Sequence, residues 1–463
     1  MRPKRPKTGI ANALPAFLGA SFLGVYGDRR VASLLFFGFS SGLPLALTGA
    51  TLAVWLTEAG VDLTNIGLVS LVGLAYALKF LWSPLVDRMA IPGLTAALGR
   101  RRGWMLLSQF CVAAAALAMA ATDPGDPEAR RWTIVWALAV AFGSATQDIA
   151  IDAYRTEILA ENQLGAGAAN LVFGYRIGML AAGGGALIVA DVAGWGWAYA
   201  LMAALMSVGA IAVLVNPEPA VRQTPGQQAL EAAGASWMAG LTGVPDAARR
   251  ALAWGYGAVF CPFLDFMQRP GWVVVLLFVA TYKYGDALLG VMAAPFYVQT
   301  GFSLTEIGLV TKGFGLAMTL VGAGLGGVLV ARYGVLRALL FCGVLQAASN
   351  LVFVVQAWVG YSMPMLMVTI SVENLTGGMG TTAFVAYLSS LCNVAYTATQ
   401  YALLSSMTAA ARTFFASGGG WLADRVDWIE YFTLTTLAAV PGLILLVWMM
   451  RRFPEQGVRQ EEI

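Results

Sequence analysis

Long apolar stretches recur along the whole chain, separated by short polar or basic segments. An α-helix rises about 1.5 Å per residue, so about 20 apolar residues are enough to cross the hydrocarbon core of a bilayer. The pattern therefore predicts an all-α membrane protein with about twelve spans, near 31–56, 64–87, 103–121, 132–154, 165–190, 194–215, 273–296, 304–331, 335–358, 362–390, 395–417 and 428–450.

Composition supports this interpretation and excludes several kinds of chemistry. The 463 residues are 59% hydrophobic and only 11% charged, too little charge to cover the surface of a soluble domain. The chain has no histidine, the usual proton shuttle and metal ligand, and its four cysteines show no metal or disulfide spacing. We therefore expect no enzyme, no catalytic residues, no cofactor and no metal site.

Basic residues in the connecting segments predict the orientation. They gather in alternate connections, for example at Arg29, Arg88, Arg100 and Arg332. The basic start of the chain, MRPKRPK, lacks the pattern of a cleavable signal. We expect cytoplasmic segments at both ends, over 1–30 and 451–463.

The stretch 216–272 interrupts the pattern and separates two halves, 31–215 and 273–450. Its part 247–267 mixes arginines with aromatic residues, which favours an amphipathic helix at the cytoplasmic interface over a pair of extra short spans. The halves share LTNIGLVS at 63–70 and LTEIGLVT at 304–311, each at the start of a second span. Two related six-helix halves describe the major facilitator architecture, which binds substrate near the midplane between them.

Several segments resemble the AmpG-type muropeptide permeases. They are SGLPL at 41–45, KFLWSPLVDR at 79–88, GRRRGW at 99–104, ATQDIAIDAY at 145–154, GAGAA at 165–169, GYRIGM at 174–179 and KYGD at 283–286. The resemblance implies proton-coupled import of anhydro-muropeptides from periplasm to cytoplasm by alternating access, for peptidoglycan recycling. It also implies a bacterial inner membrane, with an amino-sugar peptide, protons and membrane lipid as partners and no nucleic acid. We expect a monomer.

The acetyl-CoA transporters are similar at two of these segments, so another bulky anion such as acetyl-CoA stays an alternative substrate. Asp152 is followed by Ala-Tyr-Arg-Thr here, which favours the muropeptide branch. A receptor lacks a sensing domain of sufficient size, and a channel fits the duplicated halves less well.

Charged residues within the apolar spans carry the functional hypothesis, because a charge at bilayer depth survives where it pairs or lines a wet cavity. These residues are Lys79, Asp148, Arg176, Lys283, Asp286, Lys312 and Glu373. Helical spacing predicts a Lys283–Asp286 pair, and similar depths predict a Lys79–Asp148 pair. Such pairs are either structural or part of a transport path. The slight excess of cations favours an anionic ligand over a cationic one.

The roles that we expect follow from these positions. Residues expected to bind substrate or line its path are Lys79, Tyr76, Gln147, Arg176, Tyr175, Lys283, Lys312, Asn374 and Gln400. Carboxyl groups expected to exchange the proton are Asp148, Asp286 and Glu373. Residues expected to gate the cytoplasmic face are Asp87, Arg88, Arg100, Arg101, Arg102, Asp152 and Arg155.

Overall fold

The protein is seen in a computed structural model that describes residues 26–61, 70–220, 228–230, 232, 236 and 245–453. The predicted terminal segments over 1–25 and 454–463, the first copy of the repeat at 63–69, and most of 221–244 lie outside the described residues. Within the described part, every regular element is a helix.

The N-terminal half contains sixteen labelled elements in chain order. They are α3 (Arg29–Ala46), η2 (Leu47–Thr51), α4 (Leu52–Glu58), η3 (Ser70–Gly73), α6 (Leu74–Leu78), η4 (Lys79–Leu81), α7 (Ser83–Arg88), α8 (Leu94–Leu98), α9 (Arg100–Ala120), α10 (Pro127–Ile158), η5 (Glu161–Gln163), α11 (Leu164–Leu180), η6 (Ala181–Gly185), α12 (Ala186–Ala193), α13 (Trp195–Leu205) and α14 (Ser207–Val215).

The connection and the C-terminal half follow. The connection contains α16 (Asp246–Gly255), η7 (Tyr256–Phe260) and α17 (Cys261–Met267). The C-terminal half contains α18 (Trp272–Thr281), α19 (Tyr284–Gln299), α20 (Leu304–Gly308), η8 (Leu309–Phe314), α21 (Gly315–Tyr333), α22 (Val335–Val359), α23 (Met363–Ser390), η9 (Val394–Tyr396), α24 (Thr397–Ala423) and α25 (Trp428–Arg452).

Helices or runs of helices occupy the predicted spans in order. In the part of the chain that the structure describes, nine of them are long and apolar enough to cross a membrane. The other predicted spans are the broken run from η3 to α7 and the polar helices α23 and α24. The first two of these spans provide Lys79, Asp87 and Glu373 of the candidate site.

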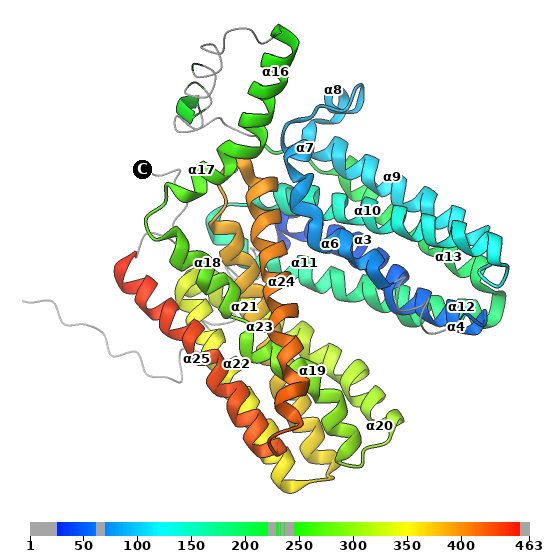
Figure 1. Cartoon of the computed structure of the whole chain (residues 1–463), viewed down its shortest axis with the longest axis vertical. Coiled ribbons are helices and arrows are strands. Elements are labelled where there is room, and N and C mark those ends of the chain that lie inside the picture. Colours follow the sequence, from blue (N-terminus) through cyan, green and yellow to red (C-terminus); the bar gives the residue numbers. More distant parts are fainter. Residues whose placement is uncertain are drawn as a thin grey trace, which may run out of the picture.

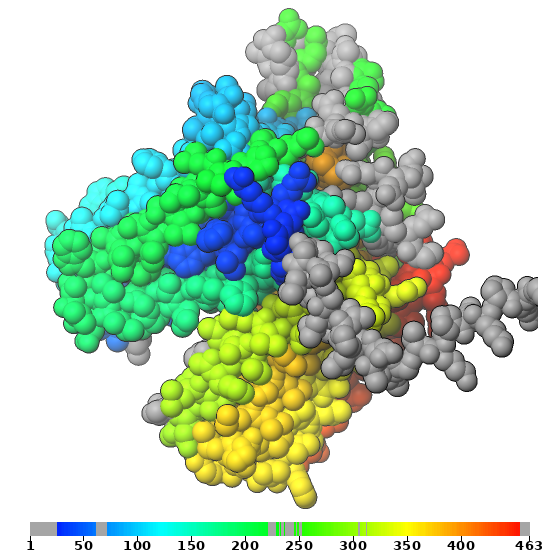
Figure 2. Space-filling model, turned by 180° about the vertical axis from the view of Figure 1, so that it is seen from behind, coloured from blue at the N-terminus to red at the C-terminus, as the bar shows by residue number. Residues whose placement is uncertain are grey.

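The two halves form separate helix bundles that meet at one end and diverge toward the other (Figure 1). The space-filling view from behind shows the same divergence, with the green surface of the N-terminal half leaning away from the yellow surface of the C-terminal half (Figure 2). The helix from α16 to α17 lies at the end where the halves meet. We name this the closed end.

A glycine contact between α11 and α21 brings the halves together at the closed end. A Cβ added at Gly165 would lie 2.5 Å from the Val330 Cβ and 2.8 Å from the Gly327 carbonyl oxygen. Both distances are too short for a real Cβ, so α11 and α21 approach this closely only because position 165 has no side chain.

Candidate functional site

Two lysines predicted to line the path sit where their helices are interrupted. Lys79 begins the short 3₁₀ segment η4 between α6 and α7. Lys283 lies in the turn between α18 and α19, with φ −99° and ψ 15°, outside the helical region. Such breaks free backbone groups inside a membrane and are tolerated where polar groups or a cavity satisfy them.

Lys79 pairs with Asp152, one helical turn from the predicted partner Asp148. The Lys79 Nζ lies 3.6 Å from Asp152 Oδ2, and Asp152 Oδ1 lies 3.3 Å from an Nη of Arg155. Residues four apart share one face of α10, so both carboxylates face the lysine and the nearer one forms the ion pair. Asp152 thus connects the mid-span lysine to the predicted gate.

Asp148 is half-buried and accepts a hydrogen bond from the hydroxyl of Ser41 in α3. The hydroxyl of Tyr76, on α6 beside α10, is buried and makes no hydrogen bond with the described residues. Tyr175 lies on α11, which packs against α3. These side chains form the N-terminal side of the site.

Lys283 and Asp286 form the predicted pair, with 3.0 Å between Nζ and Oδ2. A third residue completes it: Gln346 of α22 accepts from Lys283 Nζ at 2.9 Å and donates to Asp286. The side chains of the ion pair are partly exposed to solvent, with exposed fractions of 16% for Lys283 and 27% for Asp286. The pair is therefore held in place but still open to solvent or ligand.

Glu373 links the C-terminal cluster to the opposite half. Its carboxylate accepts from Asn374 Nδ2 at 2.7 Å, and Asn374 in turn accepts from Thr319 of α21 at 2.8 Å. Its helix, α23, packs against α11 of the N-terminal half, which carries Arg176. Glu373 and Arg176 therefore lie on helices that meet between the halves.

The Arg176 guanidinium makes no hydrogen bond or ion pair with the described residues, although the side chain is half-buried. A buried cation ordinarily pairs, because desolvation is costly. An arginine in this position can bind an anionic ligand with little internal competition.

Three predicted lining residues do not join this cluster. Gln147 is fully buried and donates to Ser40 at 3.1 Å, because it faces the packing interface between α10 and α3. Gln400 is also buried; it donates to Asp265 of α17 at 2.8 Å and so fastens the connecting helix to α24. Lys312 lies in η8, and its side chain is outside the described part of the chain.

The predicted gate residues gather at the closed end around a buried ionic cluster. Arg101 is fully buried; an Nη lies 2.7 Å from Asp87 Oδ1, and its Nε donates to Glu157 at 3.0 Å. It also donates to the Val86 carbonyl at 3.2 Å. A buried ionic cluster is stable when its hydrogen-bonding groups are satisfied in this way.

Asp87 also binds the first turn of α24 in the other half. Its Oδ2 accepts from the backbone N–H of Thr399 at 2.7 Å and from the Thr399 hydroxyl at 2.6 Å, and Oδ1 accepts from Ala398 N–H at 3.2 Å. A carboxylate at a helix N-terminus satisfies N–H groups that have no partner in the helix and complements the helix dipole.

Two arginines add contacts between the halves. The buried Arg155 guanidinium lies 5.1 Å from the ring centre of Tyr401, and that of Arg88 lies 5.9 Å from the ring centre of Tyr396. Arg102 does not cross between the halves; it donates to the Val213 carbonyl at 2.9 Å and so ties α9 to α14.

Sequence reasoning missed six polar residues that bind to the charged residues of the site or fasten the connecting helix. They are Ser41, Gln346, Glu157, Glu218, Asp265 and Thr399. Gln346 had a detectable signal, a polar side chain in the middle of an apolar span. The other residues have no local signal, because their role depends on which helices become neighbours.

The site thus has a charged centre, in which Lys283 and Asp286 are partly exposed, and an ionic lock at the closed end. A membrane protein of this form can expose its centre alternately if the halves rock, because the lock joins them by a few polar contacts.

Comparisons with known proteins agree with this architecture. The model of the Major Facilitator Superfamily matches residues 34–285 and 273–462. The proton:xylose symporter XylE superposes with a TM-score of 0.62 at 12% identity, covering 94% of this chain and 96% of that one. The Escherichia coli fucose:proton symporter FucP gives 0.62 at 13% identity, covering 90% and 98%. The predicted major facilitator fold is confirmed.

A sequence relative narrows the family. The anhydromuropeptide permease of Escherichia coli K12 is 41% identical over 432 residues, which cover 93% of this chain and 82% of the relative. The chain is therefore a membrane transporter of small molecules and not an enzyme. By this identity and coverage, it belongs to the AmpG-type anhydromuropeptide permeases of the major facilitator superfamily.

Proposed function

We propose that the protein imports anhydro-muropeptides, with or without the peptide, from the periplasm to the cytoplasm. The observation that carries the proposal is the half-buried Arg176, which has no ion-pair partner among the described residues and lies on α11, the helix that packs against α23 of the other half. A peptide carboxylate of the ligand would pair with it, and a bidentate arginine–carboxylate contact gives orientation as well as affinity. The 41% identity to a permease named for anhydromuropeptides supports this ligand class.

Proton coupling is the second part of the proposal. Glu373 accepts from Asn374 and has no direct ion pair among the described residues, so its protonation would leave no bonded cation unpaired. Asp286 is less suited, because losing its charge would leave Lys283 without its carboxylate partner. Asp148 resembles Glu373, since its direct partner is the hydroxyl of Ser41. Glu373 and Asp148 are therefore our candidates for the coupling groups.

The orientation belongs to the same proposal. The closed end carries Arg88, Arg100, Arg101 and Arg102. Basic segments favour the cytoplasmic side, which places both termini in the cytoplasm of a bacterium and the protein in its inner membrane. The structure would then represent a monomer closed to the cytoplasm.

The test is uptake by proteoliposomes that contain the purified protein and face an imposed pH gradient. We expect accumulation of labelled GlcNAc-anhydro-MurNAc and its peptides when the outside is acidic, and loss of accumulation with a protonophore. Uptake that ignores the gradient would refute the coupling, and no uptake of any anhydro-muropeptide would refute the substrate.

Another bulky anion, such as acetyl-CoA, would also be attracted by the cationic centre. Competition separates the two ligands. Excess acetyl-CoA should leave anhydro-muropeptide uptake unchanged, whereas equal inhibition by both would favour a general anion carrier.

A further inference from the structure

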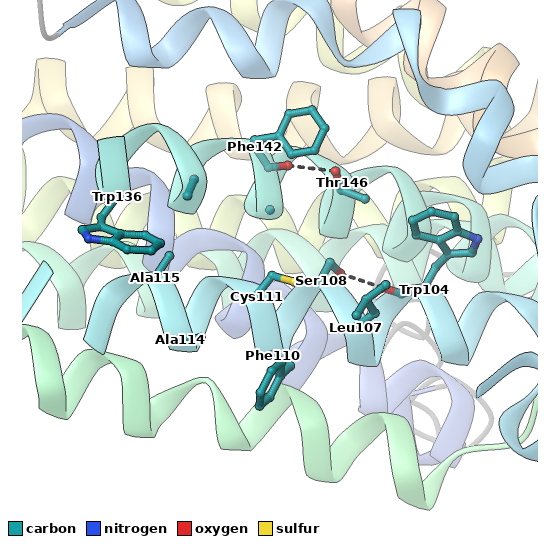
Figure 3. Close-up of a pocket in the computed structure, with 12 residues that line it drawn as sticks. Trp104, Leu107, Ser108, Phe110, Cys111, Ala114, Ala115, Trp136, Phe142 and Thr146 are labelled. Atoms are coloured by element: carbon teal, nitrogen blue, oxygen red, sulfur yellow. Dashed lines mark hydrogen bonds between the residues drawn. The ribbon is translucent and has the colours of Figure 1, made fainter. Parts of the chain in front are cut away.

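A groove lies between α9 and α10 on the surface of the N-terminal half. Its volume is about 510 Å³. Phe110 and Phe142 border it and are 71% and 51% exposed. The complete lining is Trp104, Leu107, Ser108, Phe110, Cys111, Ala114, Ala115, Trp136, Ala139, Phe142, Gly143 and Thr146 (Figure 3).

The groove offers almost no hydrogen bonds to a ligand. Ser108 donates to the Trp104 carbonyl at 2.8 Å, and Thr146 donates to the Phe142 carbonyl at 2.8 Å. Thr146 also accepts from the indole N–H of Trp82 at 3.1 Å. The hydroxyl groups in the lining are thus occupied by the protein, so the groove suits an apolar occupant.

The groove is elongated along α9. From Trp104 to Ala115 the helix rises by roughly 16 Å, at about 1.5 Å per residue. Half the hydrocarbon core of a bilayer is about 15 Å thick. Trp104 and Trp136 lie at opposite ends of the lining (Figure 3). These dimensions fit one acyl chain of one leaflet.

A cation lies just beyond the Trp104 end. Arg100 precedes Trp104 by four residues on α9, so both lie on the same face of the helix. Its guanidinium forms no hydrogen bond or ion pair with the described residues. The nearby Asp87 and Glu157 are already bound by Arg101, and Glu218 accepts from the Arg101 N–H at 2.7 Å.

We infer that this groove is a binding site for an anionic phospholipid. One acyl chain lies along α9 and α10, and the phosphate group pairs with Arg100, as guanidinium groups do with phosphates. The lipid belongs to the leaflet on the side of the closed end. The inference does not depend on the transported substrate.

Native mass spectrometry of the purified full-length transporter, with phosphatidylglycerol or phosphatidylcholine added, tests the headgroup. We expect phosphatidylglycerol to bind roughly fivefold more tightly, the effect of about one favourable arginine contact near a membrane surface. Arg100→Gln should abolish this preference. Arg451→Gln, a matched change at an exposed arginine ending α25, should retain it.

Cys111 provides a measurement in the unmutated protein. It lines the groove and is exposed, whereas Cys261, Cys342 and Cys392 are buried. Phosphatidylglycerol should slow its alkylation by N-ethylmaleimide more than phosphatidylcholine does. Ala114→Trp, which fills the groove, should remove the lipid-dependent part of this protection, whereas Ile444→Trp on the exposed face of α25 should not.

Three results would overturn the inference. Equal protection by both lipids would mean that the headgroup is not recognised, and no protection would mean that the groove does not bind lipid. Efficient disulfide formation between the Cys111 residues of two copies would mean that a second copy of the chain covers the groove.

Discussion

Asp87 and Thr399, which are 312 positions apart in the chain, are joined by two hydrogen bonds to a single carboxylate oxygen. The same carboxylate is paired with the buried Arg101. One side chain therefore belongs both to the ionic core of the N-terminal half and to the first turn of α24. The stability of the closed end should depend strongly on it.

Asp87→Asn should open the closed end. Hydrogen bonds to a charged group contribute about 1.5–3 kcal/mol each, so we expect the closed arrangement to lose roughly 3 kcal/mol, a shift of about 100-fold. Spin labels at Asn162 and Arg337, exposed positions at this end on opposite halves, would report longer distances in a Cys111→Ser background.

The control for this change is Asp191→Asn, an exposed carboxylate near the end of α12. It should leave the distance distribution of the two labels unchanged. If Asp87→Asn also left it unchanged, the carboxylate would not be part of the lock.

Glu373→Gln and Asp148→Asn should abolish accumulation driven by a pH gradient while allowing exchange of labelled for unlabelled substrate. Exchange needs binding and rocking but no net proton movement, so a group used only for coupling is dispensable for it. Glu430→Gln, an exposed carboxylate at the start of α25, is the control. Normal accumulation in either site variant would remove that residue from the coupling mechanism.

Gln346→Leu should weaken the C-terminal side of the site without unfolding the protein. It removes an acceptor from Lys283 and a donor from Asp286 but leaves their 3.0 Å ion pair. Loss of partners for partly buried polar groups costs about 1–3 kcal/mol. We expect lower thermal stability and weaker substrate affinity, whereas Gln268→Leu, at the exposed end of α17, should change neither. Unchanged affinity would show that Gln346 does not position the pair.

Gly165→Leu should hold the halves apart at the closed end, because even a Cβ there would lie 2.5 Å from Val330. The same pair of spin labels should report a permanently open end, and transport should fall to background. Gly324→Leu is a close control on the partner helix, since a Cβ at Gly324 meets no atom within 4 Å. A closed distance in the Gly165 variant would mean that α11 and α21 can part without opening this end.

Much of the architecture was predictable because apolar length alone defines a membrane span. Periodic apolar stretches located the long helices, and the basic connections located the end that carries Arg88 and Arg101. The Lys283–Asp286 pair was also predictable, since residues three apart on a helix face the same side.

Pairing between helices was less predictable. Lys79 forms its ion pair with Asp152 and not with Asp148, one helical turn away. The depth of Lys79 depends on the 3₁₀ segment that it begins in the second span. The sequence predicts Gln147 and Gln400 as hydrogen-bond partners for a polar substrate, but their side chains face helix interfaces. The rotation of each helix about its own axis determines which neighbour a side chain faces. This rotation cannot be read directly from the sequence.

The contact between Gly165 and Gly327 also affects how fast the transporter can cycle. Neither glycine contributes a side chain of its own to this contact, so neither residue must change a rotamer when the halves separate. Separating α11 from α21 at this contact should therefore cost little free energy. The activation barrier for opening is then set mainly by the hydrogen bonds of Asp87. Changes in lock strength should therefore appear directly in the turnover rate.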